Sequence, residues 1–95
     1  MAIQSFADAQ TESFFHHGTK GKAGWANIAD VVARKLDMLN AATRLSDLKA
    51  PPNNKLEALK DDLAGYHSIR ISGKWRLVFR WNDRGPTEVQ VMDYH

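Results

Sequence analysis

A single change of hydrophobic period, near residue 65, constrains the fold of this chain more than any other feature. Before it, the apolar residues of WANIADVVARKLDMLNAA recur at the spacing of one helix face: Ile28, Val31, Val32, Leu36 and Leu39. After it, apolar and polar residues alternate in GYHSIRI and KWRLVFRW, which is typical of strands with one buried face. Helices followed by strands predict an α+β fold, with N-terminal helices packed on a small antiparallel sheet.

Three strands are predicted in this sheet, joined by short turns. Ser72-Gly73 separates the first two strands, and residues 82–86 (NDRGP) separate the second from TEVQVMDY. Side chains on a strand alternate between its two faces. The apolar face is therefore expected to meet the helices, and it carries Trp75, Leu77, Phe79 and Trp81. The opposite face is expected to be open, and it carries Arg70, Arg76 and Arg80.

The N-terminal segments are predicted from weaker local signals. AIQSF is predicted as an edge strand, although Ile3 and Phe6 are three positions apart and do not alternate. ADAQTESFF is rich in helix formers, and its helix is expected to end by Gly18. The glycine-rich residues 18–24 (GTKGKAG) are expected to form a flexible loop. Asn27 is the candidate N-cap of the long helix.

Length and composition limit the classes of protein to which this chain can belong. Its 95 residues suffice for one core, so residues 1–95 are predicted to form a single domain. KAPPNN, between the long helix and the charged NKLEALKDDL, is expected to divide elements rather than domains. There is no cysteine, no secretory signal pattern and no apolar run of the roughly 18 residues that span a membrane. We therefore expect a cytoplasmic protein without a membrane role.

Positive charge is concentrated on the predicted sheet. The formal net charge is only +2, yet the stretch from Tyr66 to Trp81 contains four arginines or lysines and no acid. This local field fits either a solvated strand face or a surface that binds phosphate. The four histidines lack the spacing of a zinc site, and the common nucleotide-binding glycine motifs are missing. Neither a metal nor another cofactor is expected.

The remaining reactive residue types fit one reaction class. Histidine, carboxylates, tyrosine and arginine on a sheet can cleave RNA by attack of a ribose 2′-OH on the adjacent phosphate. A base removes the 2′ proton, a cation stabilises the phosphoryl charge and an acid protonates the leaving oxygen. The same residue types also fit a chain that merely ends in a polar tail, Asp93-Tyr94-His95.

Five stretches, in the same order along nearly the whole chain, resemble one known family. They are IQSF, RKLDMLNAAT, LKAPPNNKLEALK, GYHSIRISGKWRLVFRW and VMDYH. The chain is similar to HigB-type toxins of the RelE/ParE superfamily, close to its GraT-like members. The resemblance implies helices on a small curved antiparallel sheet (RelE-like), with IQSF as a strand.

The resemblance also implies an activity and its partners. It implies a type II toxin that enters the decoding site of the 30S ribosomal subunit and cleaves the messenger RNA there, and so inhibits translation and growth. It further implies a HigA-type helix-turn-helix antitoxin, through which the pair represses transcription. Contact with DNA is therefore expected only through the antitoxin complex.

Several functional residues of the family fall on residues of this sequence. The family's terminal Asp-Tyr-His falls on Asp93, Tyr94 and His95. The arginine that follows the sheet tryptophan falls on Arg76, and the lysine at the end of the post-proline segment falls on Lys60. The resemblance implies that Arg76 and Lys60 stabilise the charge of the phosphate.

One position departs from the family pattern. Where a well-known relative has a catalytic histidine, this chain has Glu57. A carboxylate near cations can still accept a proton, so either His95 or Glu57 is expected to be the general base or acid. Arg70 and Arg80 are candidates for further phosphate contacts.

Two other functions remain open from the sequence. ParE-type members of the same superfamily poison DNA gyrase on a similar fold, although they generally do not depend on a terminal Tyr-His beside sheet arginines. The third possibility is a non-catalytic module whose arginine face binds an acidic partner. Such a module would cleave no RNA and would be indifferent to the loss of His95.

Overall fold

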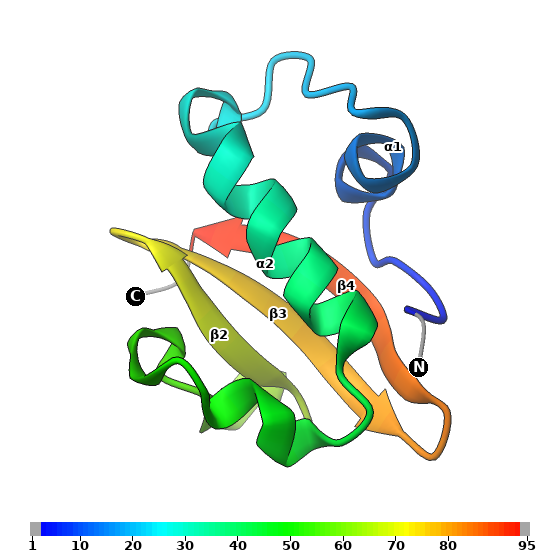
Figure 1. Cartoon of the computed structure of the whole chain (residues 1–95), viewed down its shortest axis with the longest axis vertical. Coiled ribbons are helices and arrows are strands. Elements are labelled where there is room, and N and C mark those ends of the chain that lie inside the picture. Colours follow the sequence, from blue (N-terminus) through cyan, green and yellow to red (C-terminus); the bar gives the residue numbers. More distant parts are fainter. Residues whose placement is uncertain (1–2, 94–95) are drawn as a thin grey trace.

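Two helices lie against one face of a four-stranded antiparallel sheet (Figure 1). The computed structural model describes residues 3–93. Its helices are α1 (Ala9–His17) and α2 (Ala29–Ala41), with short 3₁₀ turns η1 (Ala26–Ile28), η2 (Leu45–Lys49), η3 (Pro52–Asn54) and η4 (Asp61–Leu63). The strands are β1 (Glu57–Ala58), β2 (His67–Ser72), β3 (Trp75–Asn82) and β4 (Gly85–Asp93), in the order β1-β2-β3-β4. The predicted α+β class is confirmed. None of the helices within residues 3–93 has the length and apolar character needed to cross a bilayer.

Helix α1 ends by Gly18, as the sequence predicts, and begins at Ala9, two residues after the start of the predicted segment. Asp8 is its N-cap, and the Oδ1 atom accepts a hydrogen bond of 2.7 Å from the backbone N–H of Thr11. At the other end Gly18 takes a left-handed conformation (φ 74°), and its N–H donates to the carbonyl of Phe14 at 2.8 Å. The hydroxyl of the buried Thr11 accepts a hydrogen bond from the N–H of Val91, which fastens α1 to the last strand.

Helix α2 carries the predicted apolar stripe but not the predicted cap. Val32, Leu36 and Leu39 are buried, as the spacing indicates. Asn27 lies inside η1, and the N-cap position of α2 is Ile28, whose side chain makes no capping hydrogen bond. The N-cap prediction is therefore wrong, because a 3₁₀ turn leads the chain into the helix with tighter i to i+3 hydrogen bonds.

The helices and the sheet share one core. Apolar side chains of the helix-facing side of the sheet pack with those of α1, α2 and η2, among them Ile69, Leu77, Phe79, Val89, Leu36, Leu39 and Leu48, all 1% exposed or less. Each such burial contributes about 1.5–3 kcal/mol. Trp75 and Trp81 are partly buried against the same cluster, so the predicted helix-facing side is confirmed.

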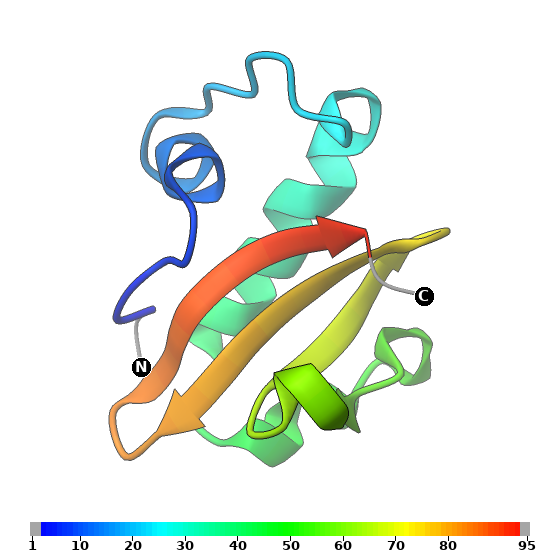
Figure 2. The same cartoon turned by 180° about the vertical axis from the view of Figure 1, so that it is seen from behind.

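The N-terminal segment forms less strand than predicted. Seen from behind, it runs beside β4 (Figure 2). Ser5 and Ala7 exchange backbone hydrogen bonds with Val89, yet from residue 3 onward the only bridge of this segment is the parallel pair Phe6↔Val89. A bulge interrupts the ladder at this point, because Glu88 (φ 53°) and Val89 together lie opposite one residue of β3. The expected strand at IQSF is thus reduced to a single bridge.

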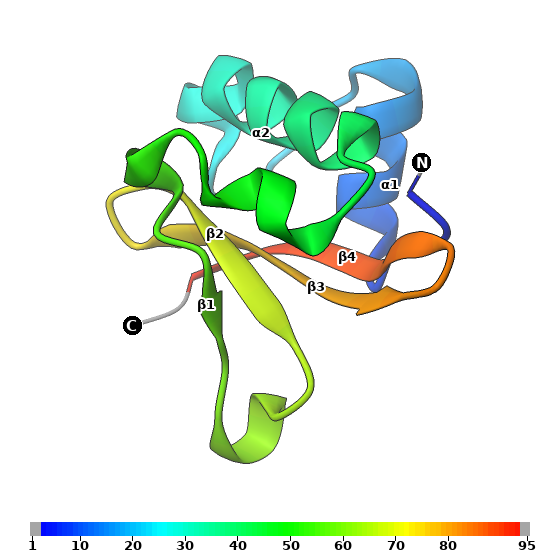
Figure 3. The ribbon, with the colours of Figure 1, turned by 60° about the horizontal axis from the view of Figure 1, so that its bottom comes forward.

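The second sheet face is less open than predicted. The sequence did not predict β1, which pairs with the first two residues of β2 and projects with η4 from the sheet (Figure 3). Ser68 and Val78 on this face are fully buried, and the Arg76 side chain is only 13% exposed. The turn after β2 also shifts by one residue. Ser72 pairs with Trp75, so Gly73, with φ 56°, and Lys74 form the turn.

Candidate active site

The guanidinium of Arg76 is held in place by three neighbours. Its Nε donates to Oγ of Ser68 at 2.7 Å, and its Nη2 donates to the carbonyl of Lys55 at 2.8 Å. The same Nη2 lies 3.4 Å from Oε1 of Glu57. These contacts come from β2, from the loop after η3 and from β1, so three separate segments fix one side chain. Such fixing lowers the reorganisation needed to bind an anion.

Part of this guanidinium remains available for a ligand. Arginine has five N–H donors in a planar fork, and the contacts of Arg76 use only Nε and Nη2. Within residues 3–93, Nη1 has no hydrogen-bond partner. Its two N–H groups can therefore donate to a phosphate, the anion that matches this fork best.

Glu57 reaches Arg76 because β1 pairs with β2. The register Glu57↔Ser68 puts the carboxylate on the sheet face that carries Ser68 and Arg76. The Glu57 side chain is 51% exposed, so a substrate can reach it. The exposed carboxylate of Glu57 and the largely buried guanidinium of Arg76 both face away from the helices. They provide a proton acceptor beside an anion-stabilising group.

Arg80 belongs to a second cluster farther along the same strand. Its Cζ lies 4.4 Å from the ring centroid of Tyr66, and its Nε is 3.5 Å from Oε2 of Glu88. The Tyr66 hydroxyl donates to Oε1 of Glu88 at 2.7 Å. Gly65 (φ 94°) passes so close that a Cβ there would lie 3.1 Å from Nη1 of Arg80. The predicted phosphate contact of Arg80 would have to compete with Glu88.

The other predicted site residues within residues 3–93 are separate from this pair. Arg70 lies directly across from Arg76 in the β2–β3 register, and it lines a cavity beside α2. Lys60 is exposed at the start of η4, and no hydrogen bond or ion pair joins it to Arg76 or Glu57. Asp93 pairs with Trp75, and its Oδ2 lies 3.3 Å from Nζ of Lys74.

The last two predicted catalytic residues, Tyr94 and His95, lie outside the described residues. On β4, the residue across from Arg76 is Met92. Asp93 is instead the register partner of Trp75, whose side chain packs on the helix-facing side.

Sequence reasoning missed four participants in these clusters. Tyr66, Ser68 and Arg70 are spaced two residues apart, so the period of two could have put Tyr66 and Ser68 on the arginine face. Glu88 lies at the bulge of β4, where this period breaks. The fourth participant is the carbonyl of Lys55, for which a sequence offers no signal. Backbone groups outside regular structure become visible as ligands only in three dimensions.

Comparisons with known proteins agree with this architecture. The family model for HigB-like toxins, described as RelE-like toxins of the type II toxin–antitoxin system HigB, matches residues 4–95. Toxin HigB-1 of Vibrio cholerae is 37% identical over 83 residues, which cover 87% of this chain and 86% of the relative. Endoribonuclease HigB of Proteus vulgaris is 28% identical over 93 residues, 98% of this chain and 99% of the relative.

Solved structures show the same fold at lower identity. The YoeB-YefM complex from Staphylococcus aureus matches with a TM-score of 0.60 at 20% identity and covers 100% of this chain and 99% of that one. The YoeB/ParE toxin from Agrobacterium tumefaciens matches with a TM-score of 0.57 at 24% identity, over the whole of both chains. The family match extends along nearly the whole sequence and confirms the resemblance drawn from its motifs. The chain belongs to the HigB-like family of RelE-like toxins of type II toxin–antitoxin systems.

Proposed function

We propose that this toxin is a metal-independent, ribosome-dependent endoribonuclease that cleaves messenger RNA in the ribosomal A site. The observation that carries the proposal is Arg76, fixed beside Glu57 with its Nη1 donors unused within residues 3–93. The Proteus vulgaris relative, named an endoribonuclease, supports the same activity. Cleavage of messengers in translation would arrest growth.

Glu57 would act when the proton leaves the ribose 2′-OH, and Arg76 would act when negative charge develops on the phosphate. The Glu57 carboxylate accepts the proton of the ribose 2′-OH, and the 2′ oxygen forms a bond to the adjacent phosphorus. Negative charge grows on the phosphoryl oxygens, where Nη1 of Arg76 donates hydrogen bonds. The bond from phosphorus to the 5′ oxygen then breaks, leaving a 2′,3′-cyclic phosphate and a 5′-hydroxyl.

The leaving oxygen needs a proton, and His95 would supply it. Glu57 holds the 2′ proton once it has acted as the base, so the acid must come from another residue. Tyr94 would stack on or orient the nucleotide, and Asp93 would orient His95 or the substrate. Lys60, with Arg70 and Arg80, would hold neighbouring phosphates.

The partners follow from family and function together. A type II toxin has an antitoxin as its partner, and we assign a HigA-type helix-turn-helix protein to this role. The other partners would be the 30S decoding site and the messenger, so the toxin would act in the cytoplasm. DNA would be contacted only through the antitoxin complex.

Primer extension on a defined messenger, in a purified translation system with and without ribosomes, tests this proposal. Wild-type toxin should give cuts in phase with the codons only when ribosomes are present. His95→Ala should abolish the cuts, and Arg84→Ala, an exposed residue of the β3–β4 turn, should retain them. Growth arrest in cells without any cleavage would reject the nuclease and direct the search to DNA gyrase.

A further inference from the structure

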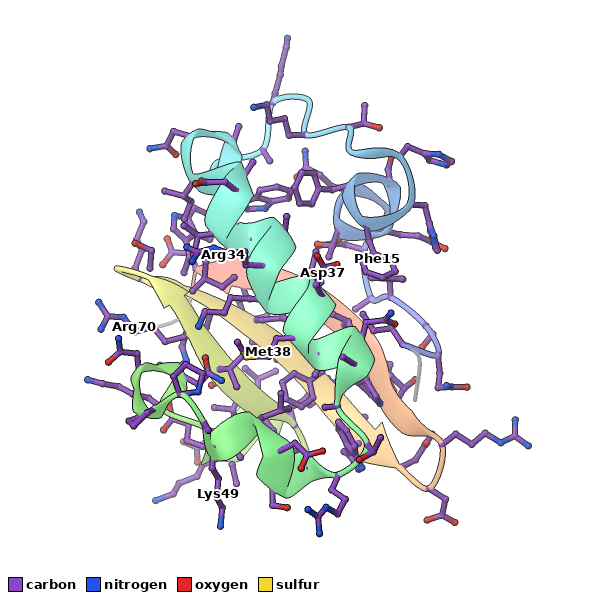
Figure 4. The ribbon with its side chains drawn as sticks, in the orientation of Figure 1. Phe15, Arg34, Asp37, Met38, Lys49 and Arg70 are labelled. Atoms are coloured by element: carbon purple, nitrogen blue, oxygen red, sulfur yellow. The ribbon has the colours of Figure 1, made fainter. Side chains whose placement is uncertain are left out.

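A cationic cavity lies next to the candidate active site, between α2, η3 and the C-terminal end of β2. Its volume is about 480 Å³. Figure 4 shows Arg34 and Met38 projecting from α2 on one side and Arg70 from the sheet on the other. Lys35 and Pro51 also line it. The cavity exists because β1 pairs only with the first two residues of β2, which leaves the far end of that edge without a strand.

The charge around this cavity is unbalanced. Arg34, Lys35 and Arg70 line it, and among the residues that the structure describes no Asp or Glu does. Other cations, such as Arg76 and Arg80, each lie within 4 Å of a carboxylate. Within residues 3–93 none of the three cavity cations makes an ion pair. Three cations around one hollow repel one another unless an anion lies between them.

Lys35 is held at this cavity by a hydrogen bond, in surroundings that disfavour its charged form. Its Nζ donates to Oδ1 of Asn54 at 2.6 Å. Asn54 is fully buried, and its Nδ2 donates to the carbonyls of Leu48 and Ala50. Burial lowers the pKa of Lys35, and the neighbouring charge of Arg34 lowers it further. An anion in the cavity would favour the charged form of Lys35 and so oppose this lowering of its pKa.

We propose that this cavity binds a backbone phosphate of the RNA chain, next to the phosphate held at Arg76. Arg70 and Arg76 are directly opposite each other on the adjacent strands β2 and β3, so one residue of each anion site belongs to the same cross-strand pair. A guanidinium fork suits a phosphate, and the apolar wall of Val31, Met38 and Ile71 suits the adjoining sugar. The choice of RNA over an acidic protein segment rests on the proposed function of Arg76.

Binding of a short RNA that cannot be cleaved tests the cavity apart from the chemistry. The probe is a 2′-O-methyl oligoribonucleotide, titrated into the purified toxin and followed by NMR over a range of salt concentrations. For a single strand, each phosphate contact contributes about 0.7 to the slope of log K against log salt. Arg34→Gln and Arg70→Gln should each reduce the slope by about this amount. The matched control is Lys49→Gln, which removes one exposed charge on η2 (Figure 4) and should leave the slope unchanged.

Two results would overturn the cavity proposal. The first is an unchanged slope in both folded variants, and the second is no RNA binding by the wild type up to millimolar concentration. If the slope is unchanged and the variants bind the antitoxin more weakly, the cavity is assigned to carboxylates of the antitoxin instead. Unchanged slopes in a toxin that still cleaves messengers would reject only the cavity. Reduced slopes in a toxin that never cleaves would reject only the nuclease.

Discussion

The carboxylate of Glu57 lies 3.4 Å from Nη2 of Arg76, although the two residues belong to strands that are not neighbours in the sheet. Strand β2 lies between them, and its Ser68 accepts the hydrogen bond from Nε of Arg76. The arginine thus reaches across β2 to the edge strand. Strand β1 has only two residues paired with β2, and the ion pair gives it a further contact with the sheet.

The fork of Arg76, rather than its charge alone, should be required for cleavage. Arg76→Lys keeps the charge but loses the planar fork and the Nε donor to Ser68. We expect messenger cleavage to fall by at least about 100-fold, because removal of one positioned donor costs about this much. Primer extension measures the rate, and Arg84→Lys is the control for exposed arginines. Full activity in Arg76→Lys would mean that cleavage requires only the positive charge at this position and not the guanidinium fork.

Glu57 should behave as a base and not only as an anchor for Arg76. Glu57→Gln keeps the shape and a hydrogen-bond acceptor but cannot take up the proton, so cleavage should fall by about 10²–10⁴-fold. Glu57→His should restore part of the rate, and the rising limb of its pH–rate profile should move toward the usual histidine pKa of about 6.5. Single-turnover cleavage over a range of pH gives both quantities. If Glu57→Gln keeps the wild-type rate and profile, the base is another residue.

The helix and strand patterns could be predicted because their causes are local. Val32, Leu36 and Leu39 follow the 3.6-residue period, and Leu77 and Phe79 follow the two-residue period. One buried face imposes each period. The same reasoning failed where the local pattern was short. Strand β1 has only two residues, too few for any period to appear.

The site could be predicted only in part, because its contacts are remote in sequence. Arg76 and Glu57 were both candidates by resemblance, but nothing in the sequence indicated that they touch. The carbonyl of Lys55 and the hydroxyl of Ser68 complete the group only after β1 and β2 have paired. The cavity beside Arg70 likewise requires α2 and η3 to be in place, and helix periodicity alone assigns Arg34 and Lys35 to the solvent.

Asn54 should contribute more to stability than any exposed polar residue near it. Asn54→Ala removes the hydrogen bonds to the carbonyls of Leu48 and Ala50 and to Nζ of Lys35. Buried groups left without partners cost about 1–3 kcal/mol each. We expect the free energy of unfolding to fall by about 2–4 kcal/mol, measured by urea denaturation at an unchanged m-value. The adjacent Asn53 is exposed, and Asn53→Ala should change stability by no more than about 0.5 kcal/mol. Equal effects of the two substitutions would contradict this role.

His67 should make the fold sensitive to acid. Burial lowers the pKa of this imidazole, which lies 6.2 Å from the Phe79 ring on the helix-facing side of the sheet. The unfolded chain, with a histidine pKa of about 6.5, then binds more protons than the native state. The contribution of His67 to the free energy of unfolding is therefore fully present above about pH 6.5. It is lost as the pH falls from there toward the lower pKa of the native state.

Substitution should isolate the contribution of His67. His67→Gln cannot titrate, so as the pH falls below about 6.5 its free energy of unfolding should depend less on pH than that of the wild type. His17 is exposed at the end of α1, and His17→Gln should retain the loss of stability toward acid. Urea denaturation at a series of pH values provides the comparison. If His67→Gln loses stability toward acid as steeply as the wild type, another group causes that loss. The imidazole of His67 would then take up its proton as readily in the folded chain as in the unfolded one.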